Sequence, residues 1–344
     1  MKQKEQTGRG MCFDTYPAPL DVVTAYTREH SIDGDVTGHY GIRIVLKLLL
    51  WFAQCLSWKA AYRVGRGIGL LFYHVRLRRK VAMVNLDIVF GDNKSHTEKM
   101  QIYKTSLINC GQVIINYLRI PFMGESFWRD HVSWQAEDIL REVMNRKKGA
   151  LLIAGHFGMM DLAGGKLGMS GYPVAVVGKR IKNPAINRFI IEMRNAMNLG
   201  TIAHRKSMQR ILEGIQRGEA VAMALDQNMK RDRGIFIDWM GRQASSVRSA
   251  AYVAKRTGAP VVAGYMLQKS EDHFQFVITK EVSWESYPED PETELLINAQ
   301  RLSDAVQAFI LEKPELWFWI HRRWRVQPEG VPDPYKRYAV DKRS

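Results

Sequence analysis

The chain has 344 residues, of which 46% are hydrophobic and 25% are charged, so it can bury a full core and is not globally disordered. Its formal net charge of +15 at pH 7 indicates an anionic partner: nucleic acid, a phospholipid surface or a phosphorylated substrate. Three widely separated cysteines give no disulfide framework and no metal-binding spacing, which favours a reducing, cytoplasmic setting.

Residues 1–40 are predicted to be a polar arm. They contain four Lys or Arg against six Asp or Glu and show no sustained periodicity. The first apolar stretch begins only near Ile42, so no cleavable signal peptide is expected.

Residues 41–80 predict a basic, amphipathic, membrane-associated helical segment. They hold nine Lys or Arg and no Asp or Glu. Lys59, Arg63 and Arg66 fall on one helical face, and aromatic and aliphatic side chains occupy much of the rest. This pattern is typical of a helix lying on anionic lipid, and the alternative is a packed helix with a solvated charged face.

The same segment is short for a membrane span. Its longest run without charge, residues 48–58, has eleven residues, whereas a spanning helix needs about 20. Snorkelling of the flanking Lys47 and Lys59 side chains would lengthen the run, so a span stays open as an alternative.

Residues 81–330 are predicted to form one catalytic α/β domain, followed by a basic tail over 331–344. Helices alternate with strands, which favours a mostly parallel central sheet with covering helices. The helices are expected within 76–125, with a turn at 91–93, and at 135–147, 159–167, 184–197, 207–217, 246–257 and 292–312; the strands are expected at 150–154, 173–177, 200–202, 220–225, 260–267 and 273–279.

A candidate catalytic pair follows the first of these strands. His156 comes directly after strand 150–154, and Asp161 lies five positions later. If Asp161 is in a helix, helical geometry alone would separate the two positions by about 140°. They therefore meet only if His156 turns back from the loop, a turn that Gly155 and Gly158 would permit.

In that arrangement Asp161 would accept a hydrogen bond from one ring nitrogen of His156 and leave the other nitrogen as a base with a pKa near neutral. The sequence has no Gly-x-Ser-x-Gly elbow and no cysteine in a reactive setting. The base would thus act on a hydroxyl or a water of the substrate. A structural histidine at a strand end is the alternative, because His-x4-Asp is a short pattern.

Four sequence blocks in a fixed order carry a resemblance to a known family. They are residues 154–161, 178–184 with Arg194 downstream, 218–261 and 314–324, and the similarity extends over about residues 42–326. On these blocks the chain resembles the bacterial lipid A late acyltransferases (the lauroyl/myristoyl transferase family), within the glycerolipid-type acyltransferases that share a His-x4-Asp/Glu motif.

The resemblance implies roles for particular residues. His156 would be the general base and Asp161 its orienting partner, although many lipid A enzymes carry Glu at the second position. Substrate contacts are implied at Arg180, Asn183 and Arg194 of the second block. Asp226 is a further candidate for a substrate contact, because it ends the apolar strand 220–225, a common position for site residues in open α/β sheets. Arg180 would meet a phosphate of the acceptor or the pantetheine arm of the donor. Alternatives stay open for these residues: surface positions for the arginines and a loop-ordering role for Asp226. For the basic triplet 321–323, a structural role and a phosphate-contacting role both stay open.

The resemblance implies a membrane-associated O-acyltransferase at the cytoplasmic face of the inner membrane. It would move a fatty acyl chain from a thioester on acyl carrier protein or coenzyme A to a hydroxyl of a lipid A-type glycolipid, with no metal or other cofactor. A lysophospholipid, a mannosyl lipid or an aminolipid is the alternative acceptor. A basic nucleic-acid-binding protein is a further alternative, for which the sequence shows no recognised motif.

Overall fold

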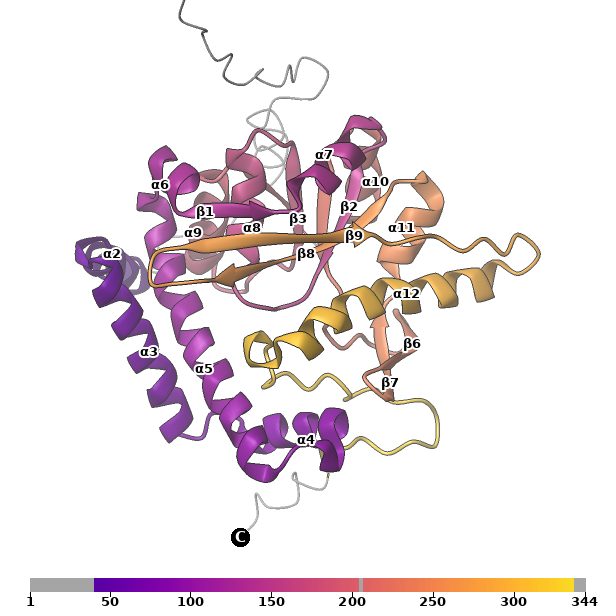
Figure 1. Cartoon of the computed structure of the whole chain (residues 1–344), viewed down its shortest axis with the longest axis horizontal. Helices are drawn as coiled ribbons and strands as arrows, with labels where there is room; N and C mark the ends of the chain where they lie inside the picture. Colours follow the sequence, from indigo (N-terminus) through magenta and orange to yellow (C-terminus); the bar gives the residue numbers. More distant parts are fainter. Residues whose placement is uncertain (1–39, 204–206, 337–344) are drawn as a thin grey trace, which may run out of the picture.

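The computed structural model describes residues 40–203 and 207–336, which build a seven-stranded sheet covered by helices (Figure 1). The strand order is β1-β9-β8-β2-β5-β3-β4, and all neighbours are parallel except β8 and β9. The predicted mostly parallel sheet is therefore confirmed. The strands are β1 (Val132–Gln135), β2 (Ala150–Ala154), β3 (Val174–Gly178), β4 (Leu199–Ala203), β5 (Ala220–Ala224), β8 (Val261–Gln268) and β9 (Phe274–Glu281).

The sheet is buried on both faces, as parallel sheets are. In β2, Leu151 and Ile153 belong to one hydrophobic cluster, whereas Ala150 and Leu152 belong to another on the opposite face. The helices divide in the same way. One face carries α6 (Glu125–Asp130), α7 (Glu137–Asn145), α8 (Met160–Met169) and α9 (Pro184–Asn195), and the other carries α10 (Ser207–Gln216), α11 (Ser249–Thr257) and α12 (Pro291–Glu312).

The N-terminal helices lie along one side and the lower end of the molecule in the view of Figure 1. They are α2 (Tyr40–Cys55), α3 (Trp58–His74), α4 (Arg79–Phe90) and α5 (His96–Arg119). On α3, Lys59, Arg63 and Arg66 are exposed, so the predicted basic face is confirmed. No helix within the described ranges is both long enough and apolar enough to cross a bilayer. The predicted arm, apart from residue 40, and residues 337–344 of the predicted tail lie outside the described residues.

Helices α3 and α5 pack closely because glycines line their contact. A Cβ on Gly111 of α5 would lie 2.1 Å from the carbonyl oxygen of Gly65 and 2.6 Å from the backbone nitrogen of Gly69, both on α3. Backbone atoms cannot move aside as a flexible side chain can. The contact therefore tolerates no side chain at position 111.

We expect Gly111→Ala to destabilise the fold by about 1–3 kcal/mol, the usual cost of overpacking. The control is Gly67→Ala on the exposed side of α3, where a new Cβ meets no atom within 4 Å. That variant should gain about 1 kcal/mol from helix propensity. Chemical denaturation of both variants checks the opposite signs, and equal stabilisation would contradict this packing.

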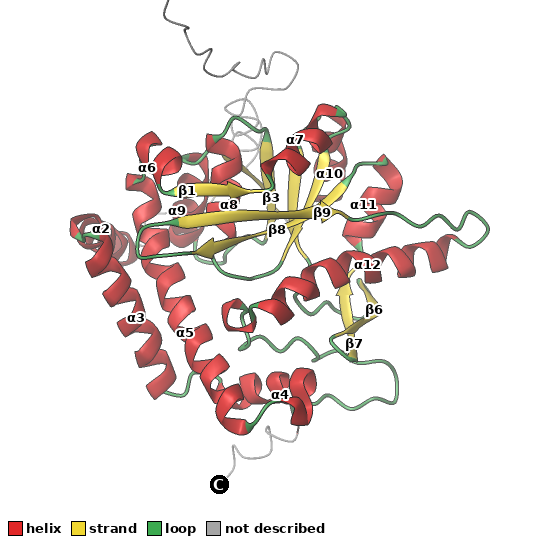
Figure 2. Ribbon diagram, viewed as in Figure 1, coloured by secondary structure: helices red, strands yellow, loops and turns green. Residues whose placement is uncertain are grey.

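The structure corrects the expected secondary structure in several places. Strand β6 (Gly234–Trp239) and strand β7 (Arg242–Val247) form an antiparallel hairpin where a loop was expected, and α11 begins only at Ser249 (Figure 2). The hairpin turn places Met240 and Gly241 at φ of +52° and +84°, a conformation typical of tight hairpins. The edge strand β1 and helix α6 were also missed; both are short.

Candidate active site

His156 lies in the loop after β2, at the carboxyl end of the central strands. The loop is fixed by two contacts: Phe157 forms a β-bridge with Trp317, and the N–H of Gly158 donates to the carbonyl of Leu316. Gly158 has a φ of +56°, and a Cβ there would lie 2.5 Å from a backbone carbonyl oxygen of β8. Glycine is therefore required at this position. The side chain of His156 remains 36% exposed.

The carboxylate on the imidazole belongs to Asp226, which follows β5, the strand beside β2. Its Oδ1 lies 2.8 Å from Nδ1 of His156, and its Oδ2 accepts hydrogen bonds of 2.8 Å from the backbone N–H of His156 and from Nε1 of Trp317. The Asp226 side chain is only 3% exposed. An ionised carboxylate only accepts, so Nδ1 is assigned the proton and Nε2 is left as the base.

This contact sets the charge of both groups. Burial alone would lower the pKa of His156, but the negative charge and hydrogen bond of Asp226 raise it above its ordinary value. Burial would raise the pKa of Asp226, but the charge of His156 and the hydrogen bonds from His156 and Trp317 lower it. The pair therefore favours an ionised Asp226 and stabilises the protonated form of His156.

The predicted hydrogen bond between His156 and Asp161 is wrong. Asp161 lies in the first turn of α8 and is 4% exposed, and its Oδ1 and Oδ2 accept from Nε and Nη2 of Arg194 at 2.9 and 3.4 Å. The helix directs this side chain towards α9, not back over the loop. Asp161 and Arg194, expected at the catalytic and substrate positions, thus form an ion pair that ties α8 to α9.

The other residues predicted from the second block have different surroundings. Asn183 caps α9, since its side-chain oxygen accepts from the N–H groups of Ala185 and Ile186 at 3.0 and 3.1 Å. Arg180 is exposed just beyond the carboxyl end of β3. Because β2, β5 and β3 are parallel neighbours, Arg180 lies on the same edge of the sheet as His156.

Gln227 was missed as a site residue, although it directly follows Asp226 in the sequence. Its side-chain nitrogen is 3.3 Å from Nδ1 and 3.0 Å from Nε2 of His156. The two ring nitrogens of His156 point in different directions in the plane of the ring. The side-chain nitrogen of Gln227 is nearly equidistant from both and therefore lies along neither direction. The Gln227 amide therefore lies beside Nε2, the nitrogen assigned as the base.

The triplet 321–323 supports the loop after β5. His321 Nε2 accepts a 3.1 Å hydrogen bond from the backbone N–H of Asn228, and burial, with a further contribution from Arg323, lowers its pKa to about 4. Arg323 is fully buried, donates to the carbonyl of Ser245 at 3.0 Å and lies 4.2 Å from the ring centre of Trp239. These contacts favour the structural alternative for His321 and Arg323.

A narrow apolar cavity of about 40 Å³ lies between α8 and the sheet and reaches Gly155, beside His156. Small side chains of the sheet line it, including Ala222 and Ala224 of β5. Ala222 is only partly buried in the middle of a central strand because it faces this space. Among residues 40–203 and 207–336, no group of three or more His, Cys, Asp or Glu side chains is arranged to hold a metal ion.

Comparison with known proteins adds a family context to this geometry. The model of a family described as bacterial lipid A biosynthesis acyltransferase matches residues 30–326. The chain is 25% identical over 294 residues to the lipid A biosynthesis lauroyltransferase of Escherichia coli K12, covering 83% of this chain and 92% of the relative. It is 23% identical over 290 residues to the palmitoleoyltransferase of the same strain (83% and 92%) and 20% identical over 275 residues to its myristoyltransferase (80% and 83%).

Proposed function

The chain belongs to the bacterial lipid A biosynthesis acyltransferase family, and from that premise we propose that it transfers a fatty acyl chain from a thioester donor to a hydroxyl of a lipid A-type glycolipid. Family membership confirms the resemblance drawn from the sequence and makes the chain an acyltransferase. The observation that carries the mechanism is the buried Asp226 on Nδ1 of a partly exposed His156.

In the proposed reaction, Nε2 of His156 removes the proton from the acceptor hydroxyl as its oxygen attacks the thioester carbonyl. The tetrahedral intermediate then collapses, the carbon–sulfur bond breaks, and the leaving thiolate takes the proton from Nε2. Asp226 keeps Nδ1 protonated and stabilises the imidazolium that forms between the two steps. The neighbouring Gln227 amide is placed to donate to the developing oxyanion.

We propose that the donor's acyl chain enters the narrow cavity between α8 and the sheet. The cavity lies beside His156 and has an apolar lining, but its 40 Å³ must widen to hold a chain. The small side chains of β5 leave room for that movement, whereas large ones would not.

Ala222→Leu is therefore expected to shift donor preference towards shorter acyl chains. The larger side chain fills the cavity, so kcat/KM should fall about tenfold or more for the longest accepted thioester and much less for the shortest. A series of acyl thioesters of graded length, assayed with wild type and variant, measures the shift. A uniform fall across the series would contradict this assignment of the cavity.

The basic surface near His156 supports an acceptor that carries phosphate. Lys179, Arg180 and Lys182 are all exposed just beyond the carboxyl end of β3. Phosphate favours such a cluster, and the guanidinium can bind it through two hydrogen bonds. The carrier of the thioester is proposed to be acyl carrier protein or coenzyme A.

We propose that α2 and α3 hold the enzyme on the cytoplasmic face of the inner membrane. Helix α2 exposes a set of large apolar side chains that would otherwise face water, and the basic face of α3 suits anionic lipid. The exposed set on α2 is Ile42, Ile44, Val45, Leu48, Leu49, Trp51 and Phe52.

An assay of the purified enzyme with a labelled acyl thioester tests the proposed function. The acceptors are a lipid A precursor, the same glycolipid without its phosphates, a lysophospholipid, a mannosyl lipid and an aminolipid. We expect transfer to the lipid A precursor and at least about tenfold weaker transfer after phosphate removal. Preferred transfer to any of the other three acceptors would overturn the substrate assignment.

A further inference from the structure

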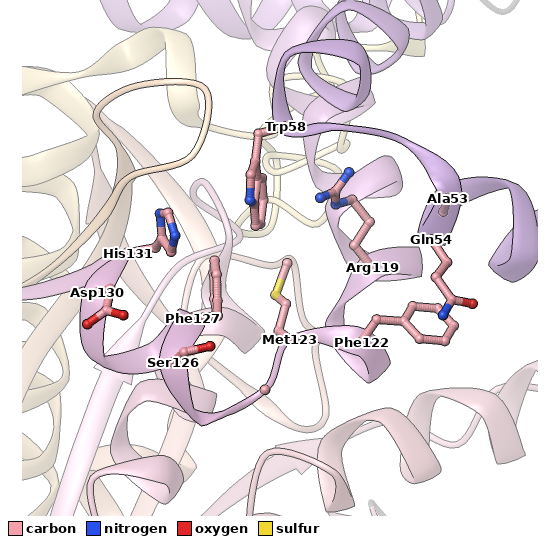
Figure 3. A pocket seen from close by; sticks show the side chains of 11 residues that line it. Ala53, Gln54, Trp58, Arg119, Phe122, Met123, Ser126, Phe127, Asp130 and His131 are labelled. Carbon is pink, nitrogen blue, oxygen red and sulfur yellow. The ribbon is translucent and has the colours of Figure 1, made fainter.

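A second cavity, of about 370 Å³, lies at the junction of the N-terminal helices and α6 (Figure 3). It is formed by the end of α2, the start of α3, the end of α5, the short helix η3 (Ile120–Phe122) and α6. It shares no lining residue with the apolar cavity beside the catalytic loop. The proposed acyl transfer does not use it.

The cavity contains a cation, Arg119, that has no acidic partner among the described residues. Arg119 is half-buried, and its Nη1 donates to the carbonyl oxygens of Leu56 and Ser57 at 2.6 and 3.3 Å. Its guanidinium lies 4.1 Å from the ring centre of Trp58. Within residues 40–203 and 207–336, no carboxylate forms an ion pair with it, and burial lowers its pKa. A desolvated cation of this kind is stabilised by an incoming anion.

The rest of the lining does not neutralise Arg119. The carboxylate of Asp130, on the rim, accepts from Nε and Nη2 of Arg129 at 2.8 and 3.0 Å. The wall is aromatic, since the rings of Trp58 and Phe127 stack with their centres 5.3 Å apart. The cavity therefore suits a ligand that combines an anion with apolar atoms.

The position of the cavity indicates where such a ligand comes from. Its lip carries Phe122, which is 44% exposed, and the neighbouring last turns of α2 expose Trp51 and Phe52. Trp51 and Phe52 belong to the α2 surface proposed above to face the membrane, and Phe122 lies beside it. A volume of 370 Å³ equals the liquid volume of about twelve waters, enough for a glycerophosphate headgroup but not for two acyl chains.

We propose that this cavity binds the headgroup of a bilayer glycerophospholipid, with its phosphodiester on Arg119 and its acyl chains leaving past Phe122 and α2. Such a lipid would fix how the enzyme sits on the membrane, separately from the acceptor bound at His156. The proposal rests on the proposed membrane association but not on the identity of the acceptor.

The test is isothermal titration of the full-length protein with monomeric dihexanoylphosphatidylglycerol. We expect saturable binding of one molecule per chain. Arg119→Gln keeps a donor for the two carbonyls but removes the charge, and it should weaken binding at least tenfold. Ser126→Trp fills the cavity from its exposed rim, leaves Arg119 intact, and should weaken binding similarly. Arg63→Gln, which removes an exposed cation of α3 that does not line the cavity, is the matched control and should bind like wild type.

Three results would overturn the proposal: unchanged binding in both cavity variants, equal weakening by Arg63→Gln, or equally tight binding of free glycerol 3-phosphate. The last result would assign the cavity to a soluble phosphate. Dihexanoylglycerol, which lacks phosphate, should not compete. Acyl transfer by the wild type is measured separately, so loss of the proposed reaction and loss of this site are told apart.

Discussion

Replacing His156 with alanine is expected to lower kcat about 10²–10⁴-fold, the usual contribution of a positioned general base. The substrate hydroxyl would then attack the thioester without a proton acceptor. The effect should be mainly on kcat, because the imidazole acts on the reacting atoms and contributes little to holding the rest of either lipid. Steady-state kinetics with the purified enzyme measures both constants.

The pH profile of the wild type is a second measurement of the same base. The neutral imidazole is the active form, so kcat/KM should fall as pH drops through the pKa of His156 in the free enzyme. Because Asp226 raises that pKa, the acidic limb should lie above about 6.5, the ordinary value for histidine. A limb in the range of a carboxyl group would instead assign the base to Asp or Glu.

Asp226→Asn is expected to cause a loss of similar size, about 10²–10⁴-fold in kcat. Two donors, the backbone N–H of His156 and Nε1 of Trp317, hold Oδ2 of the aspartate. In the variant they would hold the amide oxygen and turn the NH₂ group towards Nδ1 of His156. Nδ1 would then have to accept, the proton would move to Nε2, and the base would be lost.

Asp161→Asn is the matched comparison, because it changes the carboxylate that the sequence pattern favoured. It should weaken the ion pair with Arg194 and lower thermal stability. The acidic limb of its kcat/KM profile should lie at the same pH as in the wild type. In Asp226→Asn that limb should move to lower pH, since burial lowers the pKa of His156 once the neighbouring charge is gone. If only Asp161→Asn moved the limb, the assignment of Asp226 would be contradicted.

The sequence was sufficient to predict the sheet and the edge on which the site lies. Buried strands such as 150–154 and 220–225 stand out as apolar runs between helices, and parallel strands bring their carboxyl ends together. His156 and Asp226 could each be placed at such an end. Their pairing could not be read from spacing, because it depends on β2 and β5 being neighbours although 65 residues separate β2 from β5 in the chain.

Two predictions from the sequence were wrong: the choice of Asp161 as the partner of His156, and the loop expected where the β6–β7 hairpin lies. Asp161 is close to His156 in sequence, but the first turn of α8 directs its side chain to Arg194, a residue of another helix. Strands β6 and β7 pair with each other across a turn whose backbone conformation is set by Met240 and Gly241. At Asp161 a tertiary contact outweighs the local pattern, whereas the hairpin is a local pairing whose turn was not recognised in the sequence.

The central claim is that His156, held by Asp226, drives acyl transfer to a lipid A-type glycolipid. Mass spectrometry of the glycolipids from cells that lack the protein tests it most directly, with the gene restored as wild type, as His156→Ala or as Asp226→Asn. We expect the deletion to lose one acyl chain from lipid A, and only the wild type to restore it fully. An unchanged lipid A in the deletion strain, or full acylation restored by His156→Ala, would contradict the account.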